Sequence, residues 1–289
     1  MLKRILSILL LPALFFSACK AQKATDNKSL LWRISAKNGG KPSYLFGTIH
    51  LLCPDDYLWT EAMKASLKSC KEVCFEMDMD DPQVLMAASS GMMATDGKQL
   101  KDYFTAEQYA KLAAFTKKEL DLDLSGMQQM KPVVLQTLFI TKAVSCVMPV
   151  SYEANIMEEA KKDGKEVVGL EAAAEQLAVL NSMPDDSVVA GLMQLTDSFQ
   201  ASKEEYAQML NAYKKQDLPA LYQQINASKE LGDEMGVFLD DRNVKWIPRM
   251  QEKMKGQPVF FAVGAGHLWG DHGVITLLRK AGYRVEPVR

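Results

Sequence analysis

The chain carries the same short pattern twice, far apart in the sequence: a strand-like apolar segment that runs into Gly-x-x-His. The first copy is Tyr44 to His50 (YLFGTIH), and the second lies within Pro258 to His272 (PVFFAVGAGHLWGDH) and ends on His267. The chain has 3 histidines and 17 glycines in 289 residues, so a glycine would rarely stand three places before two of the histidines by chance. We therefore expect each motif to present a histidine at the end of a buried strand.

Four strand-like segments end on a residue that can bind a metal or transfer a proton. These residues are His50, Glu76, Glu171 and His267. In open α/β sheets the functional crevice lies outside the carboxyl ends of the strands, so residues placed in this way can converge although they are distant in sequence. The pattern predicts one split site rather than four separate positions.

Two imidazoles with one or two carboxylates form a donor set suited to a divalent metal, here Zn, Mn or Co. We expect His50 and His267 as ligands and Glu76 as a third ligand or as the base, and a carboxylate outside the metal shell can serve as general base. Gly264 and Gly266 are expected to allow a sharp turn and a close approach of substrate to the backbone.

Each of these assignments has an alternative. Glu76 competes with Asp78 and Asp80, and Glu171 can instead be the first-turn acid of a following helix. Arg242 can anchor a substrate carboxylate or phosphate, or pair with an acid on its own helix. The third histidine, His272, lies in a polar turn and is expected to face solvent.

The spacing of strands and helices predicts a single α/β domain over 30–289 with a mixed central sheet. Leu30 to Ser35 and the Tyr44 strand are expected to form a hairpin across Asn38 to Lys41. A helical insertion is expected at about 81–160, and a run of helices at about 187–256 separates the last strands from the rest. The helices are expected to shape access to the site.

The N-terminal segment has a composition different from that of the domain. Residues 1–19 join a positive start to a short apolar run that ends at Phe16-Ser17-Ala18-Cys19, which looks like a bacterial lipoprotein signal. The expected product is lipidated on Cys19 and carries a polar tether at 20–29. An ordinary secretory signal is the alternative, and in either case we expect export to the cell envelope, periplasmic or surface-facing.

The remaining cysteines determine which disulfides are possible, and the net charge bears on the expected binding partners. Cys53, Cys70, Cys74 and Cys146 allow up to two disulfides in three connectivities, or buried free thiols. A net charge of −2 provides no general attraction to nucleic acid. We expect a peptide or small-molecule substrate, with the membrane contacted only through the lipid anchor.

Five blocks of the chain resemble the TraB/GumN (TraB/PrgY/Tiki-related) family. They are YLFGTIHLL at 44–52, CFEMD at 74–78, GKEVVGLEAAAEQL at 164–177, DDRNVKW at 240–246 and VFFAVGAGHLWGDHGVITLLRKAGYRVEPV at 259–288. The resemblance implies a fold similar to erythromycin esterase-like and ChaN-like proteins, and a metal-dependent protease. It maps the two Gly-x-x-His motifs, with Gly47 and Gly264, and the acidic residue onto His50, His267 and Glu76. Glu171, Arg242 and Asn243 also match family features.

One departure concerns the segment before the Gly-Leu-Glu block. The family often has a glycine followed shortly by Asp there, whereas this chain has Ser151-Tyr152-Glu153, and we assign Glu153 no role.

Three functions follow from the whole sequence. The first is an exported metal-dependent hydrolase acting on peptide bonds, supported by Glu76, Glu171, Arg242 and Asn243. The others are a peptide-binding or small-ligand-binding regulatory lipoprotein and a metal-free esterase-like hydrolase.

Overall fold

The computed structural model describes residues 28–37, 39–227 and 236–289. The predicted signal peptide, Cys19 and most of the tether lie outside these residues. The strands are β1 (Leu31–Ser35), β2 (Ser43–Thr48), β3 (Glu72–Met77), β4 (Glu166–Glu171), β5 (Val259–Gly264) and β6 (Arg284–Pro287). The helices are α1 (Glu61–Ser69), α2 (Pro82–Gly91), α3 (Ala106–Phe115), α4 (Pro132–Ala143), α5 (Tyr152–Lys162), α6 (Ala173–Asn181), α7 (Asp185–Asp197), α8 (Phe199–Lys214), α9 (Leu218–Ala227), α10 (Asp241–Gly256) and α11 (Val274–Lys280).

The six strands form one mixed sheet in the order β4-β3-β5-β2-β1-β6. β4, β3, β5 and β2 run parallel to one another, whereas β1 is antiparallel to both β2 and β6. The β1–β2 pairing is the hairpin expected from the sequence. Within the parallel pair β2–β5, Gly47 lies opposite Val263 and Thr48 opposite Gly264, so the two Gly-x-x-His motifs leave the sheet side by side.

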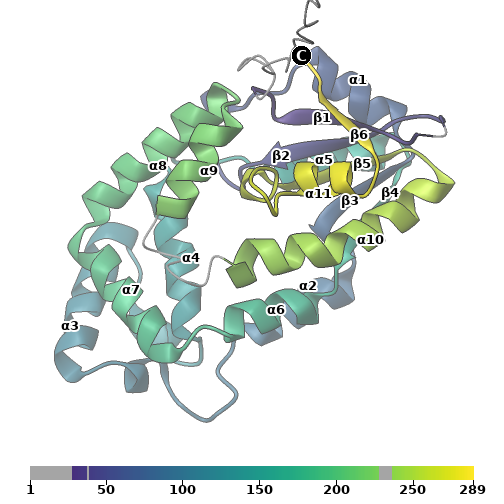
Figure 1. Ribbon diagram of the computed structural model, residues 1–289. Helices are drawn as coiled ribbons and strands as arrows, with labels where there is room; N and C mark the ends of the chain where they lie inside the picture. The colour runs from purple at the N-terminus through teal and green to yellow at the C-terminus, as the bar shows by residue number, and fades with distance from the viewer. Residues whose placement is uncertain (1–27, 38, 228–235) are drawn as a thin grey trace, which may run out of the picture.

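The helices cover both faces of the sheet (Figure 1). α1 and α5 precede β3 and β4 on one face, whereas α10 and α11 lie on the other. This division follows from right-handed crossovers, because the chain moves outward from β2 to β3 and β4 and then returns to β5. The connections that follow β2 and β5 leave in opposite directions. The carboxyl ends of these two strands therefore form the topological switch point, where open α/β sheets bind ligands.

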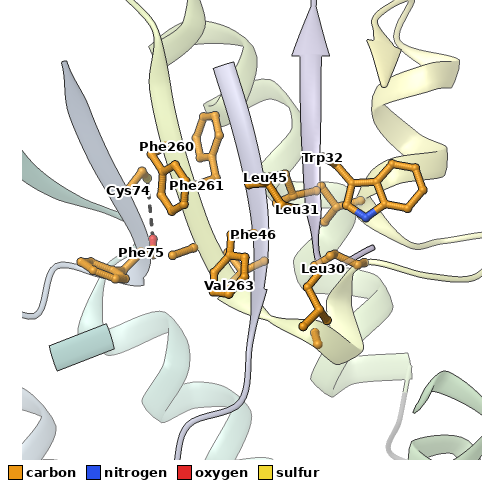
Figure 2. Close-up of a cluster of buried hydrophobic side chains, with 14 of the residues drawn as sticks. Leu30, Leu31, Trp32, Leu45, Phe46, Cys74, Phe75, Phe260, Phe261 and Val263 are labelled. Carbon is orange, nitrogen blue, oxygen red and sulfur yellow. Dashed lines mark hydrogen bonds between the residues drawn. The ribbon is translucent and has the colours of Figure 1, made fainter. Parts of the chain in front are cut away.

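Within the described residues, buried hydrophobic side chains form two cores. The larger one lies on the sheet, and Figure 2 shows Phe46, Phe75 and Phe260 gathered around the central strands, with Trp32 toward β1. The second core is built by helices alone and includes Leu112, Phe139, Leu192 and Phe199. Burial of apolar surface contributes about 25 cal/mol per Å² to stability. Each core therefore stabilises its own part of the fold, the first the sheet with its covering helices and the second the helical layer.

The helices that follow β3 and β4 lie in two stretches of the chain. α2 to α5 occupy the expected insertion, and α7 to α10 form the later helical run, in which α8 ends at Lys214 and α9 begins at Leu218. In Figure 1, α3, α4, α7, α8 and α9 make a lobe beside the carboxyl edge of the sheet. None of the helices in the described ranges combines the length and apolarity needed to cross a membrane.

Candidate active site

His50 lies two residues beyond β2 and is oriented by a carboxylate from α5. Its Nδ1 is 3.0 Å from Oε1 of Glu153, which also accepts a hydrogen bond of 2.7 Å from the Thr48 hydroxyl. The Ser151 hydroxyl donates to Oε2 of the same carboxylate at 2.8 Å. The His50 side chain is 74% exposed, whereas Glu153 is buried. Because the hydrogen bond to Glu153 stabilises the imidazolium, the pKa of His50 is raised to about 9.

A disulfide holds the two segments that carry this pair. Cys53 and Cys146 are bonded, with their Cα atoms 5.7 Å apart, and Leu52 and Val150 form an antiparallel bridge beside them. The bond selects one of the pairings that the sequence left open, and Cys70 and Cys74 are buried free thiols. The loop after His50 is therefore tied covalently to the segment that leads into α5.

His267 lies in the short helix η8 (Ala265–His267) after β5 and is buried. Its Nδ1 is 2.7 Å from Oδ1 of Asn243, whose Nδ2 donates to the backbone oxygens of His267 and His272. Since Oδ1 of Asn243 can only accept, Nδ1 of His267 carries the proton and Nε2 keeps its lone pair. Burial disfavours the charged ring and lowers the pKa of His267 to about 4.

Arg242 on α10 connects the histidine with two carboxylates. Its Nε and Nη2 donate to Glu171, and Nη2 also donates to Oε2 of Glu76 at 2.6 Å. Nη1 lies 3.3 Å from Nε2 of His267. Trp246 donates a further hydrogen bond of 2.7 Å to Glu171. Arg242 therefore pairs with acids from β3 and β4, and neither partner comes from its own helix.

Glu76 extends from β3 toward the end of β5. Its Oε1 accepts a hydrogen bond of 2.8 Å from the backbone N–H of Gly264 and lies 3.8 Å from Nε2 of His267. Burial alone would raise the pKa of Glu76, but electrostatic interactions with the His267 ring and the Arg242 guanidinium oppose it and lower the pKa to about 2. Glu76 is thus ionised throughout the neutral range.

The glycines of the two motifs allow close packing and are not needed for a backbone conformation with positive φ. Gly47, Gly264 and Gly266 do not appear among the glycines with positive φ in the described ranges. A Cβ at Gly47 would approach Leu268 to 2.9 Å, and one at Gly264 would approach the Glu76 carboxylate to 3.3 Å. Gly266 packs against Ile225 of α9, where a Cβ would come within 3.1 Å. Space between strand ends and helices is the physical reason for glycine here.

A cavity of about 550 Å³ connects these groups. His50, Glu76, Arg242 and His267 line one side of it, next to the backbone of Gly264. The opposite wall comes from α4, α7, α8 and α9. The expected convergence at the carboxyl edge of the sheet is therefore present, and the helical lobe forms the wall that faces it.

The donor set agrees with a metal site in its chemistry. Metal-binding histidines commonly donate their second ring N–H to a carboxylate or carbonyl oxygen, and Glu153 and Asn243 are such partners for His50 and His267. However, in the described ranges no three His, Cys, Asp or Glu side chains lie close enough to share one ion. Arg242 contacts both Nε2 of His267 and Oε2 of Glu76, so a cation at these atoms and the Arg242 contacts exclude one another.

The predicted residues have distinct positions in this arrangement. Asn243 contacts His267, which makes it a positioning group, and Glu171 ends β4 and faces Arg242; the first-turn acid of α6 is Glu175. His272 is exposed, as expected.

The residue that sequence reasoning missed is Glu153. A signal existed, since Glu153 shares the buried face of α5 with Tyr152, Ile156 and Ala160, and a carboxylate on an apolar face needs a partner.

Comparison with known proteins places these observations in a family. The sequence model of the TraB/PrgY/gumN family matches residues 30–287. Metalloprotease TIKI2 of Danio rerio is 24% identical over 90% of this chain and 61% of its own length. Metalloprotease TIKI1 of Homo sapiens is 24% identical (92% and 63%), and the metalloprotease TIKI homolog of Amphimedon queenslandica is 23% identical (99% and 66%). The chain thus spans less than two thirds of these relatives. No solved structure gives a significant match.

Proposed function

Because the chain belongs to the TraB/PrgY/gumN family, we propose that it hydrolyses peptide bonds in the cavity at the carboxyl edge of its sheet. The observation that carries this proposal is the meeting of His50, Glu76 and His267, from three different strand ends, on one cavity wall. The relatives that match most of this chain are named metalloproteases, which supports a protease-like reaction. Peptide-bond specificity is part of the proposal, since the likeness leaves more than a third of those two proteins uncovered.

We also propose that the reaction uses a divalent cation, with His50, His267 and Glu76 as the residues that would hold it. A cation bound there would supply Lewis acidity for the scissile carbonyl group. The chain's own groups prepare the donors: Glu153 orients His50, and Asn243 keeps the proton of His267 on Nδ1, so that Nε2 remains a donor. Because Arg242 contacts Nε2 of His267 and Oε2 of Glu76, binding of the cation would require Arg242 to give up these two contacts.

The test is peptide hydrolysis and metal content measured on the same purified protein. Wild-type protein stripped with chelator is supplied with Mn, Co or Zn and incubated with a peptide library, and products are read by mass spectrometry. We expect His267→Ala and Glu76→Gln to lose bound metal and at least about 100-fold in cleavage. His272→Ala is the matched control, because His272 is exposed and should keep both. Intact peptides after long incubation with every metal would contradict hydrolysis.

A second candidate, a metal-free hydrolase, is favoured by the opposite protonation states of two groups on the cavity wall. His50 has a pKa of about 9 and holds a proton at neutral pH, whereas Glu76 has a pKa of about 2 and is ionised. Titratable groups whose pKa values are driven apart in this way can act as acid and base. Glu76 would take a proton from water as the oxygen bonds to the carbonyl carbon. His50 would protonate the amine nitrogen as the C–N bond breaks.

Chelation separates the two candidates. In the metal-dependent mechanism, exhaustive removal of metal abolishes cleavage and re-addition restores it. In the metal-free mechanism, the chelated protein keeps its full rate, and His50→Ala removes it. His50→Gln provides a further control, since it retains hydrogen-bonding capacity to Glu153 but cannot carry an ionisable proton.

We propose that the protein is exported and anchored in the cell envelope through lipidated Cys19. The signal-like segment at 1–19 supports this, and so does the Cys53–Cys146 bond, because disulfides persist in oxidising compartments. Replacing Cys19 with Ala should move the protein from the membrane fraction to the soluble fraction and abolish incorporation of labelled fatty acid. Unchanged membrane association of Cys19→Ala would reject the lipid anchor.

A further inference from the structure

The wall of the cavity that faces the ionisable groups is apolar and is built from matching helix faces. α4 contributes Phe139 and Ala143, one helical turn apart, and α7 contributes Leu195. Phe199 begins α8 and packs edge-on against Phe139, with ring centroids 6.0 Å apart. Phe139, Leu195 and Phe199 belong to the helical core, so the cavity is an opening between that core and the strand ends.

Arg242, a positively charged residue of the cavity lining, is already engaged by two carboxylates. It lies 2.6 Å from Glu76 and 2.9 Å from Glu171. Its guanidinium is therefore neutralised by acids of the chain itself, which leaves the apolar wall as the feature that we consider for substrate selection.

One polar atom of the apolar wall lacks a partner. Oε1 of Gln224, on α9, is buried and has no hydrogen-bond partner among the described residues. Gln224 lines the cavity together with Leu221 and Ile225, its neighbours on the same helix face. A buried acceptor without a partner destabilises the protein, and a bound N–H donor removes that cost. The backbone of a peptide supplies such donors.

From these observations we propose that the cavity selects peptides with a large apolar side chain, such as Leu, Met or Phe, beside the bond that is cleaved. The apolar side chain occupies the wall formed by Phe139, Ala143 and Leu195, and a backbone N–H of the peptide donates to Oε1 of Gln224. The proposal rests on the hydrolase function proposed above, and it names the substrate class of the same site. A cavity of about 550 Å³ is large enough for such a side chain with adjoining backbone.

The size of the cavity provides the first test. Ala143→Phe fills the apolar wall, so kcat/KM for peptides with Leu, Met or Phe should fall about 10-fold or more, while peptides with Gly or Ala change less than about threefold. Phe199→Leu, a milder change that enlarges the cavity, should shift the substrate preference toward peptides with bulkier side chains. Ala87→Phe is the matched control on an exposed position of α2, and it should leave the preference unchanged. Thermal unfolding of each variant shows whether it is folded.

The acceptor provides the second test. Gln224→Leu should raise KM for the preferred peptides about fivefold with little change in kcat, because the lost hydrogen bond is made in the ground state and in the transition state alike. Gln224→Glu keeps an acceptor at the position and should retain more of the affinity. If both substitutions leave KM unchanged, the peptide backbone does not use this atom.

Binding must be measured separately from turnover so that the two proposals fail in different ways. Fluorescence anisotropy of labelled peptides reports affinity, and mass spectrometry of the same samples, with chelator and after re-addition of metal, reports whether products form. Tight binding of Leu, Met or Phe peptides with no products in either condition would reject the hydrolase and keep the apolar selection. Equal affinity for Gly and Phe peptides would overturn the selection itself. Binding of a free fatty acid with no binding of any peptide would also overturn it.

Discussion

The carboxylate of Glu153 lies 3.0 Å from Nδ1 of His50, although 103 residues separate them in the sequence. The same carboxylate accepts from Thr48 and Ser151, so its position is set by three donors. The N-terminus of α5 and the end of β2 are thereby joined into one structural unit. Thr48 and His50 of this unit line the cavity.

Glu153→Gln should change the pH dependence of activity as well as its size. Removing the charge that stabilises the imidazolium should bring the pKa of His50 from about 9 back toward 6.5, as measured by NMR titration of its ring. Loss of such a partner commonly costs 10- to 100-fold in activity. Glu158→Gln, an exposed change on the same helix, is the control. A His50 titration that is identical in wild type and Glu153→Gln would contradict this role.

Arg242 should matter more for stability than any exposed arginine. Arg242→Met leaves Glu76 and Glu171 buried without their counter-charge, which costs about 3–5 kcal/mol in the free energy of unfolding. Arg249→Met breaks a pair with Glu175 whose side chains are more than a third exposed, so about 1 kcal/mol is expected. Urea denaturation measures both. Equal losses would show that burial does not distinguish the two ion pairs.

Reduction of the Cys53–Cys146 bond should destabilise the protein. The bond joins residues 93 positions apart, and closing a loop of that length contributes about 2–5 kcal/mol in the chain-entropy account. The melting temperature of wild type should therefore fall in reductant, and that of the Cys53→Ser/Cys146→Ser double variant should be low and insensitive to reductant. Cys70→Ala, which removes a free thiol, should keep the wild-type response to reductant.

Acid should destabilise the fold through His267 and Glu76. The pKa of His267 is lower in the fold (about 4) than its ordinary 6.5, so the folded state binds fewer protons. The corresponding stability is complete above about pH 6.5 and is lost as pH falls toward 4, up to about 3 kcal/mol. Glu76 also has a lowered pKa, and its contribution is lost between pH 4.5 and about 2.

Urea denaturation at pH 7.5, 5.5 and 4.5 checks this prediction. The free energy of unfolding of wild type should fall more steeply with acid than that of His267→Gln, which has no ring to protonate. His50 has the opposite sign: its raised pKa contributes stability below pH 6.5 that is lost as pH rises through about 9. Parallel pH profiles for wild type and His267→Gln would mean that His267 is not held neutral by burial.

Several features of the fold and the site were predictable from local patterns. Apolar runs such as Val259 to Val263 favour buried strands, and the residues at which four of them end were identified as His50, Glu76, Glu171 and His267. That these residues share one edge follows from the parallel order of β4, β3, β5 and β2. The mixed sheet with helical insertions is likewise as predicted. Periodicity and strand-end rules suffice here because they concern near neighbours and general topology.

The contacts that define the site were decided by tertiary structure. Whether Arg242 pairs on its own helix or reaches Glu171 and Glu76 depends on how α10 lies across the sheet, which no local pattern contains. The Cys53–Cys146 pairing and the Glu153–His50 contact likewise join segments about a hundred residues apart. The sequence alone determined which residue types stand at the strand ends. Only the packed fold determined their partners and protonation states, because burial and neighbouring charges arise through space.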